Sequence, residues 1–267
     1  MEEQQNKDRN HTYYAIERQS CILDYINEAK RVSVNDLADY FQVSHSTIRN
    51  DLAVLKKNGQ IQRTHGGAMA LSIMKVGLET NTVVRLSNNK SEKESIAKVA
   101  SEQIDDGDTI ALLAGTTIFS LAKYLVNKKN LTIVLNDLQI AYWLNEHTDH
   151  RLFIIGGFVR NKFNCMNFDT SAVDFINIDK AFFSCTAFSA EKGAMVPDLD
   201  LATTERSVLK RAGSIVLLCD SSKFGEVSFI KIVGVEDIDV VITDSDISKF
   251  HRDTLGAIEQ LELIVAS

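Results

Sequence analysis

The stretch VSHSTIRNDLAVLKKNGQIQRTHGGA, residues Val43 to Ala68, decides the fold of the first part of the chain. Ser44 has the side chain of a helix N-cap, and Gly59 predicts where that helix ends. Between them, apolar residues recur at the spacing that buries one face of a helix: Ile48, Leu52 and Leu55. The residues after Gly59 alternate like a strand and turn at Gly66-Gly67, which predicts a short hairpin wing.

Two further helical patterns precede this stretch. The first runs over residues 16–29 and turns three apolar residues inward: Ile22, Leu23 and Ile26. The second begins near Ser33 and forms one apolar stripe: Val34, Leu37, Ala38 and Phe41. Three short helices with a tight turn between the second and the third predict a winged helix-turn-helix, whose third helix enters the major groove of DNA.

The charge of the quoted stretch differs from that of the whole chain. The chain has a formal net charge of −7 and therefore repels a polyanion as a whole, whereas the stretch carries four Lys or Arg residues against Asp51. Arg49 and Asn50 have side chains that read guanine and adenine, and lysines hold phosphates. A small helical domain with a solvated basic face is the alternative. We expect DNA contacts from His45, Ser46, Thr47, Arg49, Asn50, Lys56, Lys57, Arg63 and His65.

Length and composition predict two domains in a cytoplasmic protein. The chain has 267 residues, of which 45% are hydrophobic, and this suffices for one large core and a small second one. The cysteines form no Cys-x-x-Cys pair, which favours reduced, buried thiols: Cys21, Cys165, Cys185 and Cys219. No apolar run approaches the ~20 residues of a membrane span, so we expect a soluble chain.

Shifts in pattern predict the domain boundaries. Residues 1–15 form a polar tail, residues 16–68 the winged helix-turn-helix, and residues 69–92 a linker without a sustained period. Residues 93–267 alternate apolar runs of strand length with helical patterns, which predicts a larger, mostly parallel α/β sheet covered on both faces. The runs are 109–113, 131–135, 152–155, 181–185, 215–219, 240–243 and 263–266.

Glycines and polar residues follow several of these runs. Ligands of parallel sheets bind beyond the C-terminal ends of the strands, so these residues form a candidate effector site, although each is also typical of a capped helix start or a plain turn. Thr116 and Thr117 open a helix whose N–H groups suit a phosphate, and Lys223 adds a positive charge. Asn136 and Asp137 suit sugar hydroxyls. The full set is Gly115, Thr116, Thr117, Asn136, Asp137, Gly156, Gly157, Arg160, Asp220 and Lys223.

The pattern V-S-x-x-T-I-R-x-D-L from Val43, with Gly59 and then R-x-H-G-G-A from Arg63, resembles the winged helix-turn-helix of the DeoR family of bacterial transcription regulators. Residues 93–245 are similar to the effector domain of the same family, which shares its fold with ribose-5-phosphate isomerase and binds phosphorylated sugars or related metabolites. The matching motifs are A-G-T-T at 114–117, G-G-x-x-R at 156–160, D-K-A-F at 179–182, D-S-S-K-F-G at 220–225 and D-I-D-V-V-I-T-D at 237–244.

Four positions depart from the family pattern, and the run SCTAFSAEKGAM at 184–195 replaces one that is usually rich in Gly, Asp and Ile. Gln42 stands where the family often has Gly, and Asn50 stands where it often has a second Arg, which implies a different base preference or weaker phosphate binding. At the pocket, Leu113 replaces a common Asp and Asp137 a common Ser, which implies that a polar ligand partner has been lost at position 113. The segments FFSC and VLKRA resemble a subgroup that regulates fucose or rhamnose catabolism.

The resemblance implies a sequence-specific transcription regulator of a carbohydrate catabolism operon, controlled by a phosphorylated sugar or related metabolite and needing no cofactor. We expect a homo-oligomer on operator DNA, because one recognition helix covers only a few base pairs. A sugar-phosphate isomerase-like enzyme is the alternative, with Asp137, Asp220 and Lys223 as its base and electrophile. We expect no catalysis, because the chain also carries a DNA-binding domain, and no metal at the close pair His147 and His150, which ends a helical pattern.

Overall fold

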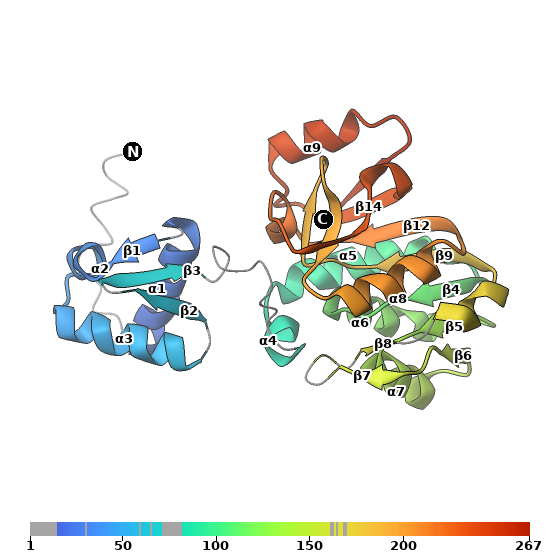
Figure 1. The fold of residues 1–267 in the computed structure, drawn as a ribbon, viewed down its shortest axis with the longest axis horizontal. Helices are drawn as coiled ribbons and strands as arrows, with labels where there is room; N and C mark the ends of the chain where they lie inside the picture. Colours follow the sequence, from blue (N-terminus) through green and yellow to red (C-terminus); the bar gives the residue numbers. More distant parts are fainter. Residues whose placement is uncertain are drawn as a thin grey trace. The chain divides into compact units, whose positions relative to one another are not determined.

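The computed structural model describes residues 15–29, 31–58, 60–64, 66–70, 82–160, 163, 165–167 and 170–267. The chain divides into two compact units, Met1–Lys75 and Val76–Ser267 (Figure 1). The predicted polar tail lies outside the described residues except for Ala15, and the predicted linker is described only at its two ends.

The described part of the smaller unit consists of three helices and a three-stranded sheet. They are α1 (Ala15–Ala29), β1 (Arg31–Ser33), α2 (Val34–Phe41), α3 (His45–Lys57), β2 (Ile61–Thr64) and β3 (Gly67–Ala70). The sheet has the order β1-β3-β2, with antiparallel neighbours. The predicted helices and hairpin wing are therefore confirmed, whereas Gly59 and His65 lie outside the described residues.

Side-chain caps explain where α2 and α3 begin. Ser33 Oγ accepts from the Asp36 backbone N–H at 3.0 Å, and the Asp36 carboxylate accepts from the Ser33 N–H at 3.2 Å. Ser44 Oγ accepts from the Thr47 N–H at 3.1 Å. Gln42 follows α2 with a left-handed φ of 52°, a conformation that favours the glycine often found there in the family. The helices pack through apolar residues that include Ile22, Ile26, Leu37, Ile48 and Leu52.

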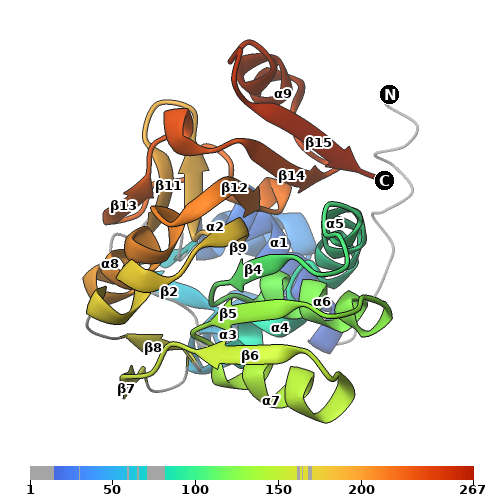
Figure 2. The same ribbon diagram turned by 90° about the vertical axis from the view of Figure 1, so that its right-hand side faces the viewer.

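A seven-stranded parallel sheet forms the centre of the larger unit. Its strands are β4 (Thr109–Leu112), β5 (Thr132–Leu135), β6 (Arg151–Ile154), β9 (Ile178–Phe183), β12 (Ala212–Leu218), β14 (Val240–Asp244) and β15 (Glu262–Ala266). Their order is β15-β14-β12-β9-β4-β5-β6, which can be followed from top to bottom in Figure 2. Each of the seven predicted apolar runs supplies one strand, so the predicted α/β fold is confirmed.

The two faces of the sheet are buried by different layers. Ile110 and Leu112 of β4 point into a core shared with the helices of one face, whereas Ala111 and Leu113 point into the core of the other. The first face is covered by α5 (Lys90–Glu102), α6 (Thr116–Tyr124) and α7 (Leu138–His147). The second is covered by α8 (Leu199–Leu209), α9 (Lys249–Gly256) and the small antiparallel sheet of β10 (Ala187–Ser189), β11 (Gly193–Val196) and β13 (Ile230–Val233).

Several short elements were not expected from the sequence. Helix α4 (Thr82–Ser87) and the first residues of α5 fall within residues 69–92, so part of the expected linker is helical. The other additions include the small sheet of β10, β11 and β13 and the β7 (Phe158–Val159) and β8 (Met166–Asn167) pair. They also include the 3₁₀ helices η3 (Leu125–Asn127), η4 (Thr170–Phe175), η5 (Ser221–Lys223) and η6 (Val235–Asp237). Within the described ranges, no helix is long and apolar enough to cross a membrane.

Candidate functional site

Helix α3 presents the predicted DNA-contacting side chains on one exposed face. Its apolar residues point into the small core, and the following side chains of the helix are exposed to solvent: His45, Ser46, Arg49, Asn50, Lys56 and Lys57. Thr47 is half-buried at the start of the helix. Arg63 of the wing donates from Nη1 to the backbone oxygen of Arg49 at 3.3 Å, so the wing contacts the first half of α3.

The one acidic residue of α3 does not share this face. Asp51 is 3% exposed and accepts hydrogen bonds from Arg18 Nε at 2.6 Å and Gln19 Nε2 at 2.9 Å, both on α1. Because Arg18 neutralises Asp51 inside the unit, the exposed charges of α3 are all positive. Sequence reasoning missed Arg18, since a single Arg on the first helix gives no signal of its partner.

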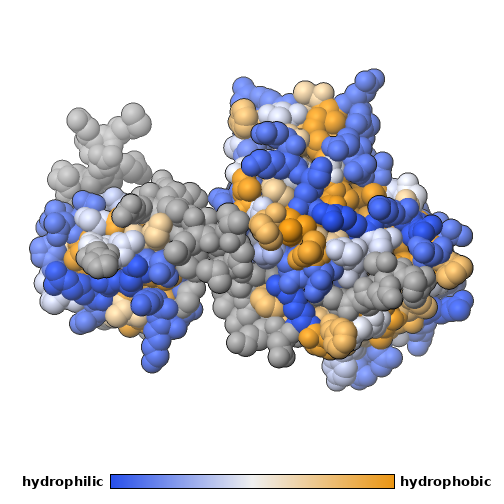
Figure 3. Space-filling view, in the orientation of Figure 1, coloured by the Kyte–Doolittle hydropathy of each residue, from blue (hydrophilic) through white to orange (hydrophobic). Residues whose placement is uncertain are grey.

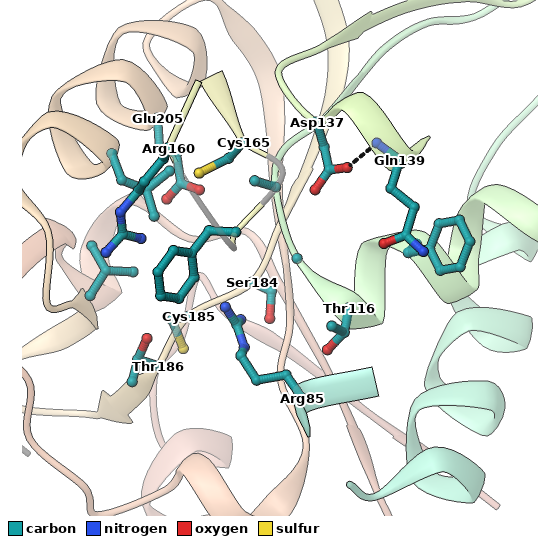
Figure 4. Close-up of a pocket in the computed structure, with 16 residues that line it drawn as sticks. Arg85, Thr116, Asp137, Gln139, Arg160, Cys165, Ser184, Cys185, Thr186 and Glu205 are labelled. Carbon is teal, nitrogen blue, oxygen red and sulfur yellow. Dashed lines mark hydrogen bonds between the residues drawn. The ribbon is translucent and has the colours of Figure 1, made fainter. Parts of the chain in front are cut away.

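A pocket lies beyond the C-terminal ends of β4, β5 and β9 (Figure 4). Strands β5 and β9 flank β4 on opposite sides, so the chain leaves this point in two directions and the loops open a crevice. The pocket is lined by Arg85, Ala114, Gly115, Thr116, Phe119, Asp137, Gln139, Arg160, Phe163, Cys165, Ser184, Cys185, Thr186, Val196, Leu201 and Glu205.

Four of the ten predicted effector residues line this pocket: Gly115, Thr116, Asp137 and Arg160. Gly115 precedes α6 and provides no side-chain cap, so among the described residues no cap side chain takes up the first N–H groups of this helix beside the pocket. Arg160 comes from the β7–β8 connection, where its N–H bonds to the Cys165 oxygen at 2.9 Å. Its Nε pairs with Asp198 at 3.1 Å.

Burial and the neighbouring groups of Asp137 act in opposite directions on its pKa. Burial raises the pKa of Asp137 to about 6, while hydrogen bonds from the Ile140 and Gln139 N–H groups and the charge of Arg85 lower it. The same two N–H bonds, at 3.1 and 2.8 Å, make Asp137 the N-cap of α7. The carboxylate is thus held rigidly at the pocket wall, where its remaining lone pairs suit hydroxyl donors.

Four further predicted residues lie near these loops without lining the pocket. Thr117 is buried in α6. Asn136 is fully buried, where Oδ1 accepts from the Ala114 N–H at 2.9 Å and Nδ2 donates to the Met166 oxygen at 3.4 Å, so it ties the loops together. Gly156 and Gly157 are exposed and follow β6, the edge strand.

Asp220 and Lys223 belong to a separate cluster on η5, after β12. Asp220 Oδ1 accepts from Asn89 Nδ2 at 2.9 Å and from the Ser222 N–H at 3.2 Å. Burial alone raises the pKa of Asp220, but Lys223, the hydrogen bonds from the Ser222 hydroxyl and the Asn89 amide, and Lys93 together lower it. Neither Asp220 nor Lys223 lines the pocket, because β12 is separated from β4 by β9.

The structure adds pocket residues that the sequence did not reveal. Arg85 of α4 is a second cation beside Arg160, and Figure 4 shows its side chain extending towards Ser184. Glu205 of α8 is fully buried at the pocket wall. Arg85 lies in a segment without periodicity, so no sequence signal pointed to it. Leu113 is buried in the sheet core and is not a lining residue. The position at which the family often has Asp therefore does not form part of the pocket wall in this chain.

Family models match both units. Residues 18–73 match the DeoR-like helix-turn-helix domain, and residues 88–245 match the DeoR C terminal sensor domain. The chain belongs to the DeoR family. It is a DNA-binding transcription regulator, and the predicted fucose or rhamnose subgroup stays a prediction.

Named relatives extend over nearly the whole chain. The HTH-type transcriptional regulator GolR of Listeria innocua is 34% identical over 88% of this chain and 93% of its own length. The transcriptional repressor AccR of Agrobacterium fabrum is 30% identical over 86% of this chain and 89% of its own length. Among solved structures, ribose 5-phosphate isomerase A from Methanocaldococcus jannaschii is 19% identical, with a TM-score of 0.40 over 51% of this chain and 55% of that chain.

Proposed function

We propose that this DeoR-family regulator acts on a carbohydrate catabolism operon and that a phosphorylated sugar in the pocket controls its binding to operator DNA. The main support for this proposal is the pocket at the switch point of the sheet. This pocket combines Arg85 and Arg160 with the N-terminus of α6, which has no side-chain cap among the described residues. Two guanidinium groups and a helix N-terminus are suited to a phosphate in an otherwise acidic chain. The proposed place of action is the cytoplasm.

The rest of the pocket suits the sugar. Asp137 and Gln139 supply acceptors and a donor for hydroxyl groups, and Ser184 and Thr186 add hydroxyls after β9. Phe119 and other apolar side chains cover the faces that a sugar ring presents through its C–H groups. We propose Gly115, Thr116, Asp137 and Arg160 as direct contacts, Thr117 and Asn136 as supports of the loops, and Arg85 in the phosphate-binding role first expected of Lys223.

Thermal unfolding with a panel of candidates tests the effector. A ligand that binds only the folded state stabilises it by RT ln(1 + [L]/Kd), which is about 2.7 kcal/mol at a hundredfold excess over Kd. The panel comprises ribose 5-phosphate, glucose 6-phosphate, fructose 1-phosphate, the corresponding free sugars and inorganic phosphate. We expect at least one sugar phosphate to raise the melting temperature by several degrees above its free sugar. If no sugar phosphate does so, the proposed effector class is wrong.

The enzyme alternative makes a different use of the same pocket. Its three proposed residues are not together, because Asp137 lines the pocket while Asp220 and Lys223 lie on η5. Incubating the protein with each sugar phosphate and following aldose–ketose interconversion tests the alternative directly. We expect turnover no faster than in a matched preparation of the Asp137→Asn variant.

A further inference from the structure

Arg85 is the pocket-lining residue that lies nearest in sequence to the DNA-binding unit. Every other described residue that lines the pocket follows α5, whereas Arg85 belongs to α4, the first described helix after β3. The chain that leaves the wing at Ala70 therefore reaches the effector pocket at Arg85 before it enters the central sheet.

The C-terminal end of α4 is anchored by a buried lysine. Lys93 of α5 is 6% exposed, and its Nζ donates to the backbone oxygens of Arg85 and Asn88, each at 2.5 Å. A helix as short as α4 is unstable alone, so these bonds to its final carbonyl groups contribute to holding it in place. The anchor uses only the main chain of Arg85 and leaves the side chain to reach the pocket.

A second anchor joins the turn between α4 and α5 to the η5 loop. Asn89 Nδ2 donates to Asp220 Oδ1 at 2.9 Å and to Ser222 Oγ at 3.2 Å. The negative charge of Asp220 also lies close enough to Lys93 to act on its ionisation. None of these anchoring side chains lines the pocket, so they hold α4 whether or not the pocket is filled.

The side chain of Arg85 supplies the contact that depends on the ligand. It lines the pocket together with Ser184 and acts on the charge of Asp137 across it (Figure 4). An anion placed between Arg85 and the N-terminus of α6 attracts both, and α6 is fixed by its packing on the sheet. With the end near Asn88 anchored, this contact sets the direction of the opposite end, at Thr82, where the chain arrives from the DNA-binding unit.

We propose that Arg85 is the residue through which an anion in the pocket controls DNA binding, by fixing helix α4 against its anchors at Lys93 and Asn89. The inference rests on the proposed function for the identity of the ligand. Arg160 binds the same anion from the β7–β8 side, where its described contacts include Asp198 and the Cys165 oxygen, and so we expect it to contribute affinity without control.

A carboxylate fixed in the pocket tests this control without any ligand. Ser184→Asp in the full chain places a negative charge beside Arg85, and Ser184→Asn is its uncharged control. The readouts are hydrogen exchange of the amides in residues 82–93 and affinity for DNA selected from a random pool by the wild type. We expect Ser184→Asp to slow exchange in this segment at least threefold and to change DNA affinity by about 5- to 150-fold, the usual range of allosteric coupling.

Second substitutions separate the two arginines. In the Ser184→Asp protein, we expect Arg85→Gln to return hydrogen exchange and DNA affinity to the values of Ser184→Asn. Arg85→Lys should retain part of the effect of Ser184→Asp, and Arg160→Gln should leave this effect intact. Lys90→Gln, an exposed lysine of the same helix as Lys93, is the surface control and should change nothing. If Ser184→Asp fails to fold, Thr186→Glu places the charge in the same pocket.

The outcomes distinguish the inference from the proposed function. Equal exchange and equal DNA affinity for Ser184→Asp and Ser184→Asn overturn the role of Arg85, as does an effect that survives Arg85→Gln. A wild-type protein that no sugar phosphate stabilises overturns the proposed effector class, while the effect of Ser184→Asp still decides the role of Arg85.

Discussion

Arg49 and Lys56 lie on the same exposed face of α3 but suit different parts of DNA. Arg49 is near the start of the helix, where side chains reach base edges, and Lys56 is in its last turn, where they reach phosphates. We expect Arg49→Ala to cost about 1–3 kcal/mol on the preferred site and to relax specificity at one position. Lys56→Ala should weaken binding to all DNA sequences alike. It should also lower the steepness of the plot of log binding constant against log salt concentration by about one. Identical effects of both changes on specific and random DNA contradict the assignment.

Asp137 makes the stability of the larger unit depend on pH. Its pKa is raised to about 6 in the folded protein from an ordinary value of 3.8, so the folded state retains the proton to higher pH. The resulting stability is present below pH 3.8 and is lost as pH rises through about 6, by up to about 3 kcal/mol. Asp137→Asn keeps an N-cap oxygen without this titration. In denaturant unfolding, the free energy of unfolding of Asp137→Asn should rise relative to that of the wild type between pH 4 and 7. A difference that stays constant over this range contradicts the raised pKa of Asp137.

The residues of the pocket were only partly predictable from the sequence. Gly115, Thr116 and Asp137 follow β4 and β5, neighbouring strands that meet at the switch point, so their position after apolar runs was informative. Lys223 also follows an apolar run, but β12 lies on the far side of β9 and its loop meets Asn89, just before α5, instead. Which loops converge depends on strand order, and the sequence alone does not contain that order.

At the scale of elements, burial determined what the sequence could predict. The inner strands of the parallel sheet are covered on both faces, so they appear as continuous apolar runs. The edge strand β6 is largely exposed but also apolar, and all seven strands were found. The small sheet was missed because β10, with Ala-Phe-Ser, and β13, with Ile-Lys-Ile-Val, are too short for a recognisable pattern. Helix α4 was missed because six residues give no helical period, and its position depends on the bond from Lys93 to the Arg85 oxygen and on the bond that joins Asn89, in the turn after α4, to Asp220.

The anchoring of α4 predicts unequal roles for two lysines of α5. Lys93 is buried and donates to two backbone oxygens, whereas the side chain of Lys90 is 72% exposed and lies 3.9 Å from Glu94. We expect Lys93→Met to lower the free energy of unfolding of the larger unit by roughly 2–4 kcal/mol, because two carbonyl groups lose a charged donor and Asp220 loses a nearby cation. Lys90→Met should change it by less than about 0.5 kcal/mol. Similar losses in both variants in chemical denaturation contradict the anchor.

At the scale of the whole molecule, one copy of α3 offers too little contact for an operator. A single recognition helix reads only a few base pairs, so specific binding in a genome requires two half-sites and hence two chains. The larger unit has apolar surface available for association, shown in orange in Figure 3, and among its described residues the most exposed large apolar side chains are Phe158, Phe175, Phe250, Tyr142 and Phe229. We therefore propose that residues after 93 hold the copies together.

The spacing of half-sites tests this assembly on DNA. Two copies related by a twofold axis present their α3 helices to the same side of the duplex when the half-site centres are one helical turn apart, ~34 Å or about 10.5 base pairs, or a multiple of it. Inserting about 5 base pairs between the half-sites of a selected operator turns one site to the opposite side and should weaken binding by at least tenfold, whereas inserting about 10 should restore most of it. Sedimentation of the free protein at micromolar concentration should show a dimer or larger. A monomer both free and on DNA, with affinity indifferent to spacing, contradicts the proposal, because the two recognition helices then have no fixed separation to match.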